Sequence, residues 1–196
     1  MPVRVLFVNP GRAVGGAEES LLLLIEGLRP QGVEAVVALF GDGPFRERLS
    51  SLGVATTCVA PSRRVLKAGR YRPPGAFAAV PLIAAGVPTA LRLAAVARRM
   101  GADVIHTNGM KAHLLGGLAS RLGRVPGIWH LRDFPPAGRA GRVFYHAARR
   151  LPRVVLAVSD AVARAVRSRD GMLPRVITLH DPIDTRRFHP GVRRER

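Results

Sequence analysis

Residues 3–28 have the sequence VRVLFVNPGRAVGGAEESLLLLIEGL, and this stretch decides the fold. Its first seven residues form an apolar, β-branched run that is typical of a buried strand. A glycine-rich turn follows, and then Leu21, Leu24 and Leu28 recur at the spacing of one buried helix face. A strand that leads through such a turn into a helix predicts the first unit of a parallel sheet.

Outward from this unit, short apolar runs alternate with longer helical patterns. Apolar runs of this nearly continuous kind are typical of strands that are buried on both faces. The expected strands are 3–9, 34–40, 54–60, 102–108, 127–131, 153–159 and 175–179. The expected helices are 17–28, 45–52, 76–100, 109–122, 140–150 and 160–169. The sequence therefore predicts a doubly wound α/β fold, a mainly parallel, Rossmann-like sheet of about seven strands with helices on both faces.

The chain length of 196 residues fits one domain of ordinary size. We expect residues 1–181 to form this domain, and 182–196, which lose strand and helix patterns, to begin a linker. Residues 61–74, PSRRVLKAGRYRPP, are basic, proline-flanked and without a clear period, which predicts a loop. Cys58 is the single cysteine and lies in an apolar stretch, so we expect a buried thiol and no disulfide.

A formal net charge of +18 is the most unusual global property of the chain, and it indicates an anionic partner. Anionic lipid, a lipid-pyrophosphate acceptor and a nucleotide sugar all fit. Nucleic acid fits less well, because the basic residues are spread along the chain and few aromatic residues are available to stack on bases. The candidates for contact with a membrane or acceptor are the basic residues of the predicted loop: Arg63, Arg64, Lys67 and Arg70.

The location of the protein is predicted from its apolar stretches. The apolar run at the start lacks the small-residue cleavage site of a signal peptide. The longest apolar stretch, residues 74–91, is interrupted by Pro81, Gly86 and Pro88 and is not a clean span of about 20 apolar residues. We therefore expect a cytoplasmic protein, with peripheral attachment to the inner face of a membrane as a further hypothesis.

The candidate site follows from the expected topology. In an open parallel sheet, ligands bind at the carboxyl ends of the strands, at the point where the strand order reverses. For a sheet that begins in this way, the reversal falls between the first and fourth strands, with the fifth strand next to the fourth. The loops after these three strands should therefore share one crevice.

The loop after the first strand places Gly15 and Gly16 directly before a helix. Glycine permits close backbone approach, and the helix start offers unpaired N–H groups and the positive end of its dipole, which suits a phosphate. The spacing matches neither the dinucleotide-binding nor the P-loop motif. Two alternatives stay open: the glycine pair only makes a turn, and Glu18 either contacts the ligand or complements the helix dipole.

The loop after the fourth strand, HTNGMKAH, carries His106, Asn108 and Lys111. Short hydrogen-bonding side chains with one cation suit sugar hydroxyls or a phosphate. The alternative is that Thr107 or Asn108 only caps the following helix.

The loop after the fifth strand places His130 at the strand end, followed by Arg132 and Asp133. The position beside two other polar loops favours a functional role for His130. Arg132 and Asp133 either contact a ligand or form an ion pair that holds the loop. No G-x-S-x-G motif indicates nucleophilic hydrolysis, and the six histidines lack the spacing of metal ligands, so no metal site is predicted.

Together these stretches resemble the N-terminal domain of the family 4, or group 1, glycosyltransferases of the GT-B fold. The matching pieces, in the family's order, are RVLFVNPGRAVGGAEESLLLLIEGL, ADVIHTNGMKAH, WHLRDF, VLAVSDAVARAV and HDPIDTRRFHP. The resemblance implies a hexosyltransferase-type reaction of bacterial cell-surface or natural-product glycans. A sugar moves from a nucleotide donor to an acceptor hydroxyl, with retention at the anomeric carbon and without a metal or other cofactor.

By position, the resemblance implies that the Gly15–Gly16 loop approaches the donor pyrophosphate or the acceptor. It places His130 beside the transferring sugar and His106 and Asn108 on the acceptor side. The nucleotide sugar is then a co-substrate, held mainly by a C-terminal donor domain outside these residues. One departure from the family is Asp181-Pro182, where Asn-Gly is common.

We therefore expect the acceptor-binding half of a retaining glycosyltransferase, inactive or nearly so without its donor domain. A second hypothesis is a stand-alone binding module that presents an anionic or lipid-linked acceptor to a partner. A basic nucleic-acid-binding domain is the third.

Overall fold

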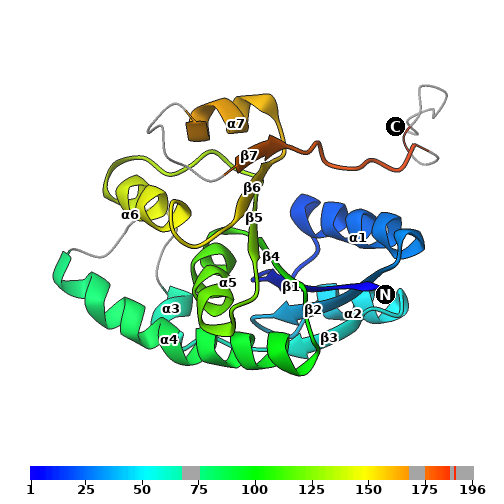
Figure 1. Ribbon diagram of the computed structural model, residues 1–196, viewed down its shortest axis with the longest axis horizontal. Coiled ribbons are helices and arrows are strands. Elements are labelled where there is room, and N and C mark those ends of the chain that lie inside the picture. The colour runs from blue at the N-terminus through cyan, green and yellow to red at the C-terminus, as the bar shows by residue number, and fades with distance from the viewer. Residues whose placement is uncertain (68–75, 168–174, 186–187, 189–196) are drawn as a thin grey trace, which may run out of the picture.

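The computed structural model describes residues 1–67, 76–167, 175–185 and 188, and within them seven strands form one parallel sheet (Figure 1). The strands are β1 (Val3–Asn9), β2 (Val33–Leu39), β3 (Ala55–Cys58), β4 (Val104–Asn108), β5 (Gly127–Leu131), β6 (Val154–Ala157) and β7 (Arg175–Thr178). The helices are α1 (Gly16–Leu28), α2 (Pro44–Ser51), α3 (Arg63–Lys67), α4 (Ala76–Arg99), α5 (Met110–Gly123), α6 (Gly138–Ala148) and α7 (Asp160–Arg167), with a 3-10 turn at Arg29–Gln31. The predicted doubly wound α/β class is confirmed.

The order of the strands is β3-β2-β1-β4-β5-β6-β7, so the direction of winding reverses between β1 and β4. In the register at this point, Val8 pairs with Thr107, and Asn108 pairs with His130 on the next strand. The predicted reversal point is therefore confirmed, and the carboxyl ends of β1, β4 and β5 lie at one edge.

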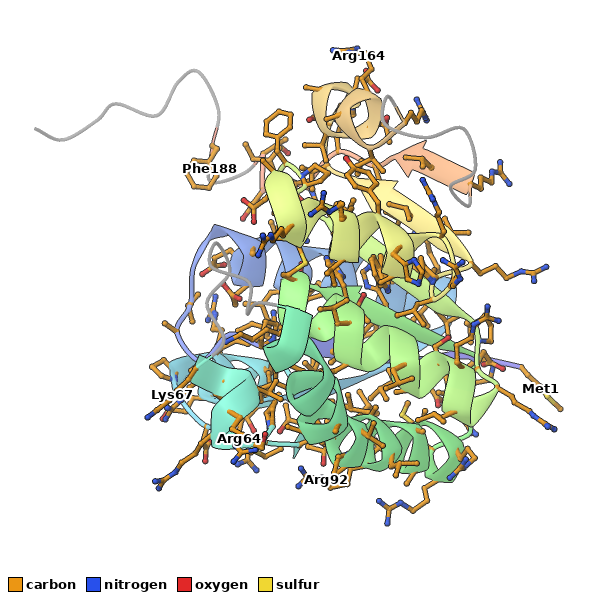
Figure 2. The ribbon with its side chains drawn as sticks, turned by 90° about the vertical axis from the view of Figure 1, so that its left-hand side faces the viewer. Met1, Arg64, Lys67, Arg92, Arg164 and Phe188 are labelled. Carbon is orange, nitrogen blue, oxygen red and sulfur yellow. The ribbon has the colours of Figure 1, made fainter. Side chains whose placement is uncertain are left out.

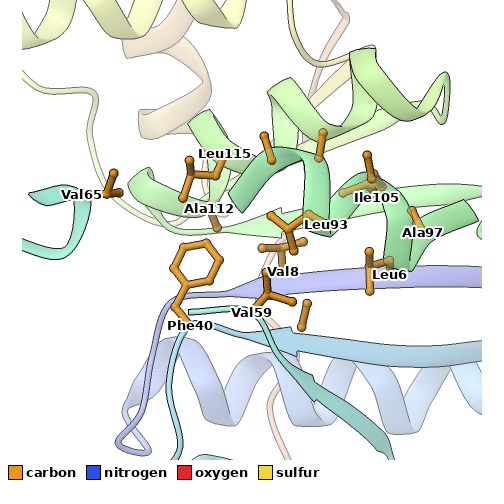
Figure 3. Close-up of a cluster of buried hydrophobic side chains, with 14 residues drawn as sticks. Leu6, Val8, Phe40, Val59, Val65, Leu93, Ala97, Ile105, Ala112 and Leu115 are labelled. Atoms are coloured by element: carbon orange, nitrogen blue, oxygen red, sulfur yellow. The ribbon is translucent and has the colours of Figure 1, made fainter. Parts of the chain in front are cut away.

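The two faces of the sheet carry separate hydrophobic clusters. Alternate residues of β1 point to opposite faces, as in any strand. Leu6 and Val8 pack with residues of α4 and α5 such as Leu93 and Leu115, in the cluster that Figure 3 shows. Phe7 belongs to a second cluster, with residues of α1 and α2. A third cluster joins β5 and β6 to α6 and α7. The near-continuous apolar strands reflect this covering of both faces.

Two expectations about the third strand and its following segment are wrong. Residues 63–67 form the short helix α3 inside the predicted loop, because Val65 is buried in the α4–α5 cluster. A helix of five residues is too short to show a period. Cys58 is exposed, because β3 is the edge strand of the sheet. Arg70 and the rest of 68–74 lie outside the described residues.

The other boundaries agree with the expected elements to within a few residues, and the 3-10 turn is the one further addition among the described residues. No helix in the described ranges is long and apolar enough to span a bilayer. The assignment of 182–196 as a linker stays a prediction.

Helix α5 lies close to β4 because it presents glycine to the sheet. A Cβ atom on Gly116 would come 2.5 Å from Cγ2 of Thr107 and 3.6 Å from Cγ2 of Val8. Thr107 is fully buried and donates a hydrogen bond to the carbonyl of Ile128 at 3.0 Å, so it has little freedom to move. The close approach therefore depends on the missing side chain.

Gly116→Ala should lower the free energy of unfolding by roughly 1–2 kcal/mol, because overpacking outweighs the better helix propensity of alanine. The matched control is Gly27→Ala in α1, where a Cβ atom would meet nothing within 4 Å. That change should raise the free energy of unfolding by roughly 0.5–1 kcal/mol. Urea unfolding of both variants measures the difference. If Gly116→Ala had the same free energy of unfolding as the wild type, α5 would have room for the methyl group.

Candidate functional site

A pocket of about 250 Å³ lies at the carboxyl ends of β1, β4 and β5. All three segments expected to share a crevice contribute to its wall, with Glu18 from the first turn of α1, Asn108 from the end of β4 and Arg132 from the loop after β5. Gly15 and Gly16 lie just before Glu18 and outside the wall itself. The site is thus formed where the winding direction reverses.

The start of α1 is closed by the side chain of Glu18. The carbonyl of Gly15 accepts hydrogen bonds from the amides of Glu18 and Glu19, at 3.1 and 2.9 Å. In return, the amide of Gly15 donates to Oε2 of Glu18 at 3.2 Å. Because Gly15 has no side chain, this is one half of a capping box, in which the Glu18 carboxylate satisfies the amide of the N-cap residue.

Arg132 joins the loops around the pocket. Its Nε donates to Oδ1 of Asn108 at 2.8 Å, and its Nη1 donates to Oγ of Ser20 at 2.7 Å. Nη1 also forms an ion pair with Asp181, in the segment after β7. Arg132 therefore pairs with Asp181, whereas the sequence suggested Asp133, which is exposed on the pocket wall.

His106 and His130 form a buried pair behind the pocket. They are 4% and 1% exposed, and their ring centroids lie 5.3 Å apart. Phe7 packs against the His106 ring edge to face. Within the described residues, Nε2 of His106 and both ring nitrogens of His130 have no hydrogen-bond partner. Neither histidine is part of the pocket wall.

Both histidines are neutral near pH 7. Burial lowers the pKa of His106 well below its ordinary value, and the nearby His130, Arg132 and His113 lower it further. Burial, followed by the charge of Arg132, lowers the pKa of His130 to about 4, although Asp181 acts in the opposite direction. A protonated imidazole would lose its hydration here and face the Arg132 charge.

Lys111 lies away from the pocket wall. Its Nζ donates a hydrogen bond to the carbonyl of Leu66, near the end of α3. The lysine therefore ties the first turn of α5 to α3 in this structure.

The helix-cap alternative for Thr107 and Asn108 is wrong. The N-cap of α5 is Gly109, which has a φ of 91° and makes no side-chain cap. Thr107 instead lies within 2.8 Å of Nδ1 of His113 and donates to Ile128, while Asn108 accepts from Arg132. These contacts leave Asn108 in the pocket wall, where it was expected to bind a ligand.

Sequence reasoning missed three polar residues of this network. Asn9 ends β1; its Oδ1 accepts from the amide of Gly11 at 2.7 Å, while its buried Nδ2 has no partner among the described residues. Ser20 and Asp181 are the other two, and they share a hydrogen bond of 2.6 Å. A polar residue at the end of a buried strand signals Asn9 in the sequence. No local pattern connects Ser20 to Asp181.

Two residues of the pocket wall, Asn9 and Arg132, carry hydrogen-bond donors without partners among the residues that the structure describes. Nδ2 of Asn9 and Nη2 of Arg132 are buried and unpartnered within the described part of the chain. A buried donor without a partner costs about 1–3 kcal/mol, which a ligand oxygen would recover. In the described ranges, no three His, Cys, Asp or Glu side chains converge to hold a metal ion. The site therefore suits a ligand rich in oxygen.

Solved structures with the same fold include a protein in complex with UDP and glucose and a glycosyltransferase. The Anabaena protein Alr3699/HepE, in complex with UDP and glucose, has 24% identity and a TM-score of 0.70, with 94% of this chain and 46% of that chain covered. A Rickettsia africae glycosyltransferase has 14% identity and a TM-score of 0.72, covering 99% and 47%. Acinetobacter baumannii MurG has 16% identity and a TM-score of 0.59, covering 91% and 44%. This chain thus spans less than half the length of each of the three.

A comparison with the sequences of curated proteins found no match. The model of the family described as Glycosyltransferase Family 4 matches residues 14–187, which include Glu18, Asn108 and Arg132 of the pocket wall. The shared fold is that of GT-B glycosyltransferases. The chain therefore belongs to Glycosyltransferase Family 4.

Proposed function

We propose that this chain is the acceptor-binding half of a retaining, sugar-nucleotide-dependent glycosyltransferase. The observation that carries the proposal is the pocket of a family 4 domain at the point where the strand order reverses. Residues with hydrogen-bond donors that are unpartnered within the described structure line this pocket. HepE, which has the same fold, was solved with UDP and glucose, and this chain covers 46% of it. A second domain would supply the other wall of the site and most contacts to the donor, so the chain by itself is inactive or nearly so.

In this proposal the site works by positioning and by fixed dipoles, which act on charge as it develops in the transition state. The start of α1, with Gly15 and Gly16, meets a phosphate of the donor or the acceptor. Asn108, Arg132 and Asp133 line the acceptor side. The reaction needs no metal or other cofactor besides the nucleotide sugar.

His130 has a positioning role in this proposal. A group with a pKa of about 4 is a weak base and is poorly suited to take a proton near pH 7. A neutral ring with two unpartnered nitrogens can instead hydrogen-bond a hydroxyl of the sugar, or it can support the packing of Arg132. Because His130 is 1% exposed, contact with a ligand requires a neighbouring side chain to move.

His130→Ala should lower turnover of the intact enzyme by about 100-fold, as expected for the loss of a placed hydrogen bond in a reaction site. Transfer from a panel of nucleotide sugars measures the effect, and circular dichroism shows that the fold is kept. His146→Ala, on the exposed face of α6, is the control and should be normal. Near-normal turnover of His130→Ala would remove His130 from the mechanism.

The pH dependence of stability tests the neutral state of His130. The folded pKa is about 4 and the unfolded pKa is about 6.5, so the unfolded chain binds more protons between these values. The stabilisation from neutral His130 is therefore complete above pH 6.5 and is lost as pH falls toward 4, by about 3 kcal/mol.

Urea unfolding between pH 4.5 and 7 should show a steeper loss of stability in the wild type than in His130→Asn. His146→Asn serves as the control, because that side chain is exposed. Parallel curves for the wild type and His130→Asn would show that the His130 imidazole is not kept neutral by the fold.

A membrane-facing role for the basic segment is a further part of the proposal. Arg63, Arg64 and Lys67 are exposed on α3, and Leu66 beside them is 42% exposed. Figure 2 shows Arg64 and Lys67 pointing away from the body of the domain. A basic surface with an apolar residue suits an anionic bilayer that holds a lipid-linked acceptor, with the protein on the cytoplasmic side. Arg70, in the same stretch of sequence, lies outside the described residues.

Reversal of these charges should weaken binding to phosphatidylglycerol vesicles by more than about tenfold, at about 1 kcal/mol for each basic residue. The variant is Arg63→Glu/Arg64→Glu/Lys67→Glu. The control reverses the same number of exposed arginines, at the far ends of α4 and α5: Arg98, Arg99 and Arg121. Co-sedimentation measures binding. Equal binding of the wild type to neutral phosphatidylcholine vesicles would contradict an electrostatic attachment.

A further inference from the structure

The carboxylate of Glu18 occupies the start of α1, where the proposed function places a ligand phosphate. Its Oε2 accepts the amide of Gly15 at 3.2 Å. Its other oxygen lies so close to the backbone of Gly11 that a Cβ atom there would be 2.3 Å away. The side chain is thus packed between the loop and the helix start, and it forms part of the pocket wall.

Other groups in the same wall point to an anionic ligand. The buried Nδ2 of Asn9 and Nη2 of Arg132 have no acceptor among the described residues. Oδ1 of Asn9 lies 3.1 Å from the position of a Cβ atom on Gly11, on the side where the Glu18 carboxylate packs. Asn9, Arg132 and Glu18 therefore belong to one pocket wall, and Asn9 lies against Gly11 beside the Glu18 carboxylate.

Two anions compete for this region. A helix start carries a partial positive charge and binds either a carboxylate or a phosphate. No ion pair joins Glu18 to a cation in the described ranges, so its negative charge is directed to the helix start and the pocket. A phosphate at the same place would meet both the occupied amide and the repulsion of the carboxylate.

We propose that Glu18 is an internal anion that a ligand phosphate must displace, and that it sets the affinity of the pocket for phosphate-bearing ligands. In this structure it satisfies the donor of Gly15 and neutralises the helix start. On binding, the phosphate takes over that amide and Glu18 turns out of the cap. The inference rests on the proposed function, which places a phosphate at this helix.

Glu18→Gln tests the inference, because it removes the charge and keeps an oxygen that accepts the amide of Gly15. Glutamine is a natural residue of the capping box, so the helix start should fold normally. The matched control is Glu19→Gln, which removes the same charge from the same turn, where the side chain is exposed and outside the pocket wall. Isothermal titration of the intact protein uses UDP, pyrophosphate and uridine as probes.

Glu18→Gln should bind UDP and pyrophosphate roughly fivefold more tightly than the wild type. Glu19→Gln should stay within about twofold, and uridine, which has no phosphate, should bind alike to all three proteins. Unchanged or weaker binding of both phosphate probes by Glu18→Gln overturns the inference and leaves the proposed function intact. Absence of UDP and pyrophosphate binding in the wild type as well would overturn the proposed function together with the inference.

Discussion

The Arg132 guanidinium contacts Asn108 at the end of β4, Ser20 in α1 and Asp181 beyond β7, and the shape of the site depends on these contacts. A guanidinium that is only 10% exposed is costly to bury unless its charge and donors are matched. Each partner therefore has a defined place relative to the other two. The edge of the sheet at which the strand order reverses becomes a pocket with fixed walls, because one cation holds its parts together.

The fold could be predicted from the sequence because burial of the sheet on both faces requires a recognisable pattern of apolar residues. Each strand of a doubly wound sheet must be apolar along its length, and the helices between them must have one apolar face. These requirements are local, so they were visible in residues 3–28 and in the later runs. Helix α3 could not be predicted in this way because it is too short to show a period, and the exposure of Cys58 depends on which strand lies at the edge.

The candidate site could be predicted only in part. Residues at the ends of β4 and β5 were found because the topology fixes where those strands end, and Asn108 and Arg132 do lie in the pocket wall. The burial of His130 behind that wall could not be foreseen, because it depends on side chains from neighbouring strands. The sequence places Asp181 at the end of the domain. No pattern in the sequence near it indicates its contact with Arg132, 49 residues earlier.

The ion pair between Arg132 and Asp181 also bears on how enzymes with this architecture can exchange parts. The last strand ends at Thr178, yet the counter-ion of a buried cation lies three residues further along the chain. Recombination between these positions with a related sequence that lacks the aspartate would leave Arg132 without its counter-ion, and a buried unpaired cation is strongly destabilising. A junction that keeps this ion pair therefore lies after Asp181, beyond the end of the last strand.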